Sequence, residues 1–126
     1  MKDVVMRLYD EVLNQGRLDV ADEIIASTLS TAPGDPPGPE RVKQISTHIR
    51  SALPDMHFDV QDMIAEDNRV ATRWTLTGTH TGTFFGAPPT GRPIEIRACV
   101  IFEFKDDQIT NLWPVIDTSA LRATVS

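Results

Sequence analysis

The chain has 126 residues, 40% of them hydrophobic, which is enough for one domain with one hydrophobic core. Its 12 basic and 18 acidic residues give a net charge of -6, and no basic run is interleaved with aromatic residues, so nucleic acid is not expected as a partner. Charges recur every few positions in residues 1–16, which excludes a signal peptide or membrane span there and favours a cytoplasmic protein with no membrane partner.

Helices are predicted in the first half of the chain. Residues 1–16 form the first, because apolar side chains recur at spacings of three and four and Gly16 follows where a left-handed cap is favourable. Residues 17–25 predict a short second helix by the same spacing. Residues 39–55 predict a third, with one proline in its first turn and another that ends it.

Strands are predicted after residue 55, where the period of the apolar residues changes to two. Residues 56–67 and 68–82 form one pair of strands, and residues 92–117 form two more, joined by a turn at residues 106–107. Because helices come first and strands later, the sequence predicts an α+β fold with helices on one face of an antiparallel sheet. Asp117 is expected to cap a last helical turn rather than to act in catalysis.

Two loops are rich in proline and glycine. Residues 27–40 carry four prolines and two glycines, so they form either a surface linker or a loop over the mouth of a pocket. Residues 82–91 join two strands, and their glycines and prolines suit a wide hairpin connection. Phe84 and Phe85 in this connection serve either as anchors of the loop or as a pocket lid, and anchoring is the preferred interpretation.

Residues 69–96 read RVATRWTLTGTHTGTFFGAPPTGRPIEI, and residues 101–117 read IFEFKDDQITNLWPVID. These segments resemble the SnoaL-like polyketide cyclase (ester cyclase-type) family, and residues 12–25 and 38–55 look like its helical half. The resemblance implies a single α+β domain over residues 1–126, of the nuclear transport factor two-like superfamily. Such a domain is a cone-shaped barrel in which a curved antiparallel sheet wraps round N-terminal helices and holds a deep apolar pocket.

The resemblance also implies where a catalytic site would lie. In cyclases of this family, a buried aspartate on the last strand moves a carbon-bound proton, and burial raises its pKa so that it acts near neutrality. Here Pro114 stands at the matching position and Leu112 where a histidine often lies, while Val100 and Ile45 match two further polar positions. All four are apolar, so the usual aldol mechanism is not expected, whereas a substrate-binding cavity lined by Ile45, Val100 and Leu112 is.

His80 and Asp62 are the predicted catalytic residues. His80 lies in the Gly-Thr-His-Thr-Gly motif and, by alternation, on the same face as Trp74; the alternative is a strand-end histidine bonded to a backbone carbonyl. Asp62 shares strand parity with a core-facing apolar row, where a buried carboxylate would serve as a general base. The alternative for Asp62 is a solvated pocket rim or an ion pair with Arg73 or Arg97.

Phe58, Trp74 and Trp113 complete the predicted substrate-binding residues. Both tryptophans are large enough to wall an aromatic ligand, and the alternative is that they serve the core or a dimer contact. Tyr9 and His48 lie on predicted helices, near the apolar stripe and beside it, and are lesser candidates.

Two classes of function compete. The preferred one is a cofactor-independent cyclase or isomerase (lyase or isomerase class) of secondary metabolism, such as antibiotic biosynthesis, acting on a bulky apolar polyketide-like or polycyclic substrate. It would work by proton transfer through Asp62 or His80, or by folding the substrate alone. A cofactor-independent hydroxylase is a variant that rests on family analogy. The other class is a non-catalytic module that binds an apolar metabolite.

No structural metal site is predicted, because the three histidines lack the spacing of a zinc site. The single cysteine also excludes an intramolecular disulfide. A homodimer is expected through the outer sheet face, on which alternation places Arg73, Thr75, Arg97 and Ile101.

Overall fold

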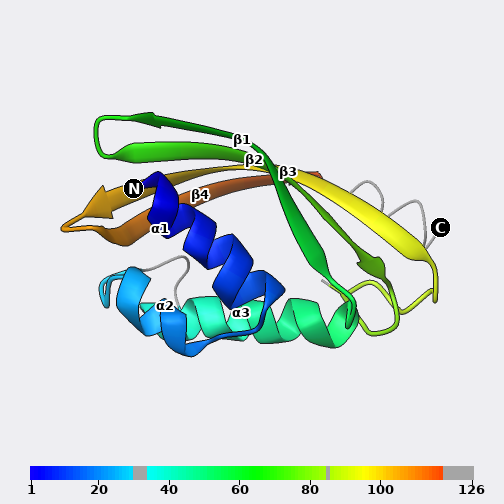
Figure 1. The fold of residues 1–126 in the computed structure, drawn as a ribbon. Coiled ribbons are helices and arrows are strands. Elements are labelled where there is room, and N and C mark those ends of the chain that lie inside the picture. Colours follow the sequence, from blue (N-terminus) through cyan, green and yellow to red (C-terminus); the bar gives the residue numbers. More distant parts are fainter. Residues whose placement is uncertain (30–33, 85, 118–126) are drawn as a thin grey trace.

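A computed structural model describes residues 1–29, 34–84 and 86–117. The helical segments are α1 (Lys2–Arg7), its π-helical continuation η1 (Leu8–Asn14), α2 (Asp19–Ile24) and α3 (Pro39–Ala52). The strands are β1 (His57–Glu66), β2 (Arg69–Thr79), β3 (Pro93–Lys105) and β4 (Gln108–Asp117). They pair antiparallel in the order β1-β2-β3-β4, and Figure 1 shows a curved sheet with the helices on one of its faces. The α+β prediction is confirmed.

The helix predicted over residues 1–16 forms, and its second half is wound as a π-helix. Gly16 ends it with a φ of 73°, a conformation that a residue without a Cβ adopts readily. The Asn14 side chain ties this end to β1, because it donates to the Phe58 carbonyl (3.0 Å) and accepts from the Phe58 N–H (2.7 Å). The junction fixes the helical face on which Tyr9 meets the sheet.

Strand β3 alternates strictly between buried and outward-facing residues. Its buried side chains are Ile94, Ile96, Ala98, Val100, Phe102 and Phe104. The side chains between them include Arg97, which lies on the outer face as predicted and forms an ion pair with Glu95 (3.0 Å). An antiparallel sheet that packs one face on helices and leaves the other outward produces this pattern.

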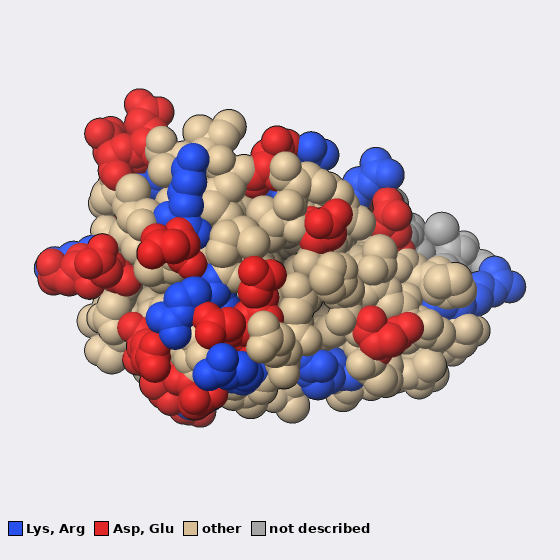
Figure 2. Space-filling model, in the orientation of Figure 1, with Lys and Arg blue, Asp and Glu red and all other residues tan. Residues whose placement is uncertain are grey.

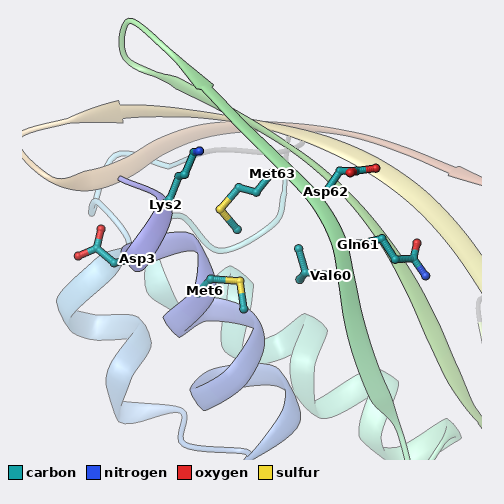
Figure 3. Close-up of a pocket in the computed structure, with 7 residues that line it drawn as sticks. All are labelled: Lys2, Asp3, Met6, Val60, Gln61, Asp62 and Met63. Carbon is teal, nitrogen blue, oxygen red and sulfur yellow. The ribbon is translucent and has the colours of Figure 1, made fainter.

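Strand β1 departs from simple alternation through a β-bulge. Its pairing with β2 skips Gln61, which is one residue too many for the partner strand. Figure 3 shows the consequence: Val60 and Met63 turn toward α1, whereas Gln61 and Asp62 both point to the other side of the strand. The prediction that Asp62 belongs to the core-facing row is therefore wrong, because the bulge shifts the parity by one residue.

The Gly-Thr-His-Thr-Gly motif clasps the C-terminal end of α3. The N–H groups of Thr81 and Gly82 both donate to the Ala52 carbonyl, at 3.0 and 3.1 Å. Just beyond the helix, the Asp55 carboxylate accepts from the N–H (2.7 Å) and hydroxyl (2.8 Å) of Thr79, which lowers the pKa of Asp55. The motif thus joins the end of β2 to α3.

Phe84 anchors the loop that follows this motif. It is buried, exchanges two backbone hydrogen bonds with Ala87 (3.0 and 2.9 Å) and stacks on the His48 ring of α3. The predicted anchoring role is therefore confirmed for Phe84. Phe85, and all but the first residue of the turn predicted over residues 117–123, lie outside the described residues.

Candidate functional site

An apolar cavity of about 260 Å³ lies between the helices and the inner face of the sheet. Its wall combines η1, α3, the four strands and the loop after β2. The lining residues are Leu8, Tyr9, Leu13, Arg41, Val42, Ile45, Ile49, Phe58, Trp74, Leu76, Phe84, Ile96, Val100, Phe102, Leu112, Pro114 and Ile116. The element order of the chain thus builds one cavity from residues that are far apart in sequence.

The cavity opens between α3 and the second half of β4, where its lining residues are the more exposed ones. Pro114 and Ile116 are exposed on β4, and Ile45 is half-buried on α3. Arg41 is the one charged residue in the described wall. Its guanidinium pairs with Asp35 (3.4 Å), which belongs to the proline-rich loop before α3. Sequence reasoning missed Arg41, because helix periodicity carries no sign of a cavity mouth.

Tyr9 forms the aromatic floor of the cavity with three ring neighbours. The centroid of its ring lies 5.7 Å from that of Phe58, 6.2 Å from that of Trp74 and 6.1 Å from that of Phe102. Burial raises the pKa of the Tyr9 phenol well above its usual value, and the nearby Thr72 hydroxyl and Trp74 indole oppose the rise only in part. The phenol is therefore neutral and can donate a hydrogen bond. Its place on the apolar stripe of the first helix was the sequence signal for this position.

Most of the predicted substrate-binding residues come together in this wall. Ile45, Phe58, Trp74, Val100 and Leu112 all line the cavity. Pro114 also lines it, so each position at which the resemblance implies a polar residue faces the cavity and carries an apolar side chain. Contact of these residues with a substrate remains a prediction.

Trp113 lies on the opposite face of the sheet. Alternation along β4 directs Leu112 and Pro114 into the cavity and Trp113 away from it, where it is 47% exposed. The Arg69 guanidinium carbon lies 5.3 Å from the centroid of its ring, within cation–π range. This placement corrects the prediction that Trp113 walls the pocket. It also rules out the core as the alternative, while a dimer contact of Trp113 remains a prediction.

His80 is fully buried but does not line the cavity. Its Nδ1 lies 3.4 Å from Thr90 Oγ1, and its Nε2 has no hydrogen-bond partner among the described residues. The loop folds round it, since its carbonyl accepts from the N–H groups of Thr90 (3.1 Å) and Gly91 (2.7 Å) and its own N–H donates to Arg92 (2.9 Å). Phe84 packs edge-on against its ring and lines the cavity in its place. A catalytic role for His80 remains a prediction.

Asp62 lies outside the cavity, on the side of β1 that faces away from α1 (Figure 3). Its carboxylate accepts from Arg73 at 2.6 Å, and its side chain is 57% exposed. The ion pair with Arg73 was the alternative interpretation of this residue, and it is the arrangement that the structure has. Asp62 and His80 therefore do not share one site with the apolar wall.

Charged residues of both signs are interspersed over the helical side of the molecule (Figure 2). Lys43 pairs with Asp22 (3.0 Å), and Arg7 pairs with Glu23 (2.8 Å). Within the described ranges, no group of His, Cys, Asp and Glu side chains is arranged to hold a metal ion. In the same part of the chain, no helix is long and apolar enough to cross a membrane.

Comparisons with known proteins agree with this architecture. A crystal structure of IdmH from Streptomyces antibioticus, provisionally described as a polyketide cyclase, is 30% identical and superposes with a TM-score of 0.80 over 98% of this chain and 96% of that chain. A second provisional polyketide cyclase, from Acidithiobacillus ferrooxidans, is 27% identical with a TM-score of 0.81, covering 98% and 92% of the two chains.

A third structure extends the range of activities named among proteins of this fold. AclR from Streptomyces galilaeus, provisionally described as a hydroxylase, is 23% identical with a TM-score of 0.82 over 98% of this chain and 93% of that chain; at this identity the likeness shows the fold alone. No curated protein matches the sequence. The model of the SnoaL-like polyketide cyclase family matches residues 3–125, and the chain belongs to that family.

Proposed function

We propose that this protein is a cofactor-independent cyclase- or isomerase-type tailoring enzyme that acts on a bulky, apolar, polyketide-like or polycyclic molecule. The observation that carries the proposal is the cavity of about 260 Å³, whose described wall is apolar and aromatic apart from Arg41 at its mouth. Cavities with apolar walls and few polar groups bind small molecules by removing their apolar surface from water.

The described wall can orient a substrate but offers no base. It holds no carboxylate and no histidine, Arg41 is a permanent cation, and burial keeps the Tyr9 phenol protonated. Holding reacting atoms close together contributes up to about 7–11 kcal/mol to lowering a barrier. The proposed reaction is therefore one that proceeds once the substrate is folded correctly, and Pro114 in place of the family's aspartate fits such a reaction.

The experiment is to incubate the protein with extracts of its producing organism and to identify by mass spectrometry what it retains and what it converts. A product with the substrate's mass and a new skeleton supports a cyclase or isomerase. A gain of one oxygen would instead show a hydroxylase, and a ligand retained but never changed would show a binding module.

A matched pair of variants shows whether the cavity is responsible. Ile45→Trp places a large ring in the cavity, and Thr77→Trp places the same ring on the outer face, where Thr77 is exposed. Conversion should be lost in the first variant and kept in the second. Equal activity in both would contradict the assignment of the reaction to this cavity.

We also propose that two copies of the chain pair through the outer sheet face. Ile64, Ala71, Ile101 and Trp113 are successive cross-strand partners, so they form one apolar row across the four strands. Ile101 is 42% exposed. A row of this kind on a sheet face is self-complementary about a two-fold axis, and burying it removes apolar surface from water.

Size-exclusion chromatography with light scattering tests this pairing. The wild-type protein should elute as a dimer, Ile101→Lys should be a monomer, and Thr77→Lys, at the polar end of the same face, should remain a dimer. A wild-type monomer at high micromolar concentration would contradict the proposal.

A further inference from the structure

Arg41 is a charged residue in a described wall that is otherwise apolar or aromatic. It belongs to the first turn of α3, lines the cavity at its open end and is half-buried. A cation is unfavourable in the first turn of a helix, because the N-terminal end of the helix dipole is itself positive. The stability of α3 therefore does not explain an arginine at this position, and a role at the cavity mouth does.

The contacts of the Arg41 guanidinium include one neutral hydrogen bond and one long ion pair. Nη1 donates to Gln44 Oε1 (2.9 Å) on the next turn of α3. Nη2 lies 3.4 Å from Asp35 Oδ2, which is longer than the about 2.7–2.9 Å of a strong charge-assisted hydrogen bond. Asp35 does not line the cavity, so its carboxylate reaches the guanidinium from the loop before α3 rather than from inside. A carboxylate placed inside the mouth would compete with Asp35 for the same guanidinium.

We propose that Arg41 binds the carboxylate of an amphipathic ligand at the cavity mouth, in exchange for its contact with Asp35, while the apolar body of the ligand fills the cavity. This inference rests on the proposed function of the cavity, and it names the ligand's polar group and the direction in which the ligand lies. The apolar body is removed from water against the aromatic floor. The carboxylate stays at the open end, where it is paired and partly hydrated, so that no unpaired charge is buried.

A carboxylate suits this position better than a phosphate or an ammonium group does. The planar guanidinium presents its N–H donors in a fork that matches the two oxygens of a carboxylate. Exchange with Asp35 replaces one single negative charge by another, and the Asp35 side chain, which is 31% exposed, can turn to water when it is displaced. A phosphate would bring about two negative charges close to Asp35, and an ammonium group would be repelled by Arg41.

The test compares 1-naphthylacetic acid with 1-naphthylacetamide, which have the same rings and nearly the same size but differ in charge. Isothermal titration calorimetry of the full chain, at neutral pH and low ionic strength, gives both dissociation constants. We expect the acid to bind about tenfold more tightly than the amide, as one hydrogen bond to a charged group would give. The wild-type comparison does not depend on the folding of any variant.

Three variants separate the role of Arg41 from a general effect of charge. Arg41→Gln removes the charge and keeps a polar side chain, so the acid should lose its advantage while the amide binds as before and reports an intact cavity. Asp35→Asn removes the competing carboxylate, so the acid should bind about threefold more tightly than it binds the wild type. Arg97→Gln makes the same change of charge as Arg41→Gln on the outer face, where Arg97 is 75% exposed, and should leave the preference unchanged.

The outcomes separate this inference from the proposed function. If both ligands bind the wild type equally, or if the preference survives in Arg41→Gln, the carboxylate site is refuted while the apolar cavity stands. Arg41 would then be a side chain whose stem covers the wall and whose head is held by Asp35. Unchanged or weaker binding of the acid to Asp35→Asn would contradict the exchange of partners. If neither ligand binds, the proposed function of the cavity fails and the carboxylate site fails with it.

Discussion

Replacing Gly82 by Ala should destabilise the protein, because the added Cβ would collide with backbone atoms at the end of α3. A Cβ at this position would lie 2.6 Å from the Ser51 carbonyl oxygen and 3.1 Å from the Ala52 Cα, and neither atom belongs to a side chain that can turn away. The φ of Gly82 is not in the left-handed region, so the effect is one of space rather than of backbone conformation. The loop must move away from the end of α3.

The magnitude follows from what this movement disrupts. The hydrogen bonds from Thr81 and Gly82 to the Ala52 carbonyl would lengthen, and each contributes about 1 kcal/mol. Overpacking at a close contact adds about 1–3 kcal/mol, so a total loss of about 2–4 kcal/mol is expected. That is a large part of the roughly 5–15 kcal/mol that holds a domain folded, and it should lower Tm by roughly 10 °C.

Urea unfolding, followed by circular dichroism, measures this loss against a matched control. Gly86→Ala adds the same methyl group where nothing lies within 4 Å, although its φ of +80° is unfavourable for alanine and costs about 1 kcal/mol. Gly82→Ala should be clearly the less stable of the two variants. If the urea midpoint of Gly82→Ala equals that of the wild type, or exceeds that of Gly86→Ala, then the Gly-Thr-His-Thr-Gly motif does not stabilise the protein through its contact with α3. A chemical role for the motif would then be the better explanation.

Three further outcomes are expected. Asp62→Asn should leave turnover of an identified substrate unchanged and lower the free energy of unfolding by only about 0.2–1 kcal/mol, because the ion pair with Arg73 is more than half exposed; lost turnover in a folded variant would restore Asp62 as a base. Hydrogen bonds from Thr79 lower the pKa of Asp55 below its ordinary value of 3.8, so the stability they contribute is present above that pH and is lost as the pH falls through the folded-state pKa. Urea midpoints of wild type and Asp55→Asn should therefore converge in acid, and a constant difference would contradict this. Ile45→Trp should abolish retention of apolar ligands in equilibrium dialysis while its circular dichroism stays native.

The parts of the fold that follow from local periodicity were predictable from the sequence. The buried row of β3 alternates without interruption, and the turn after it falls at residues 106–107 as the pattern indicates. Periodicity failed where one extra residue entered a strand. Gln61 is polar and its neighbours continue an apparent alternation, so nothing local marks the bulge, and Asp62 was placed on the wrong face.

The candidate site was predictable only where the alternation of side chains along a strand, or the family resemblance, assigned a residue to the cavity. Ile45, Val100 and Leu112 were placed in the cavity wall by the family resemblance, which matched them to positions that line the pocket of related proteins, and all three line the cavity. Arg41 was missed for a physical reason: its neighbours across the cavity mouth, such as Pro114, are brought to it by the curvature of the sheet. Curvature arises from twist and bulges summed over four strands, which no single stretch of sequence records.

The apolar character of the whole wall has a physical logic of its own. The resemblance implies polar residues at positions on α3, β3 and β4 that here meet in one cavity as Ile45, Val100, Leu112 and Pro114. Removing only some of a set of interacting buried polar groups leaves the others desolvated and unpaired, which costs free energy, whereas replacing all of them by apolar groups can be nearly neutral. A cavity that works without proton transfer, as proposed above, is therefore most stable when every member of the set is apolar.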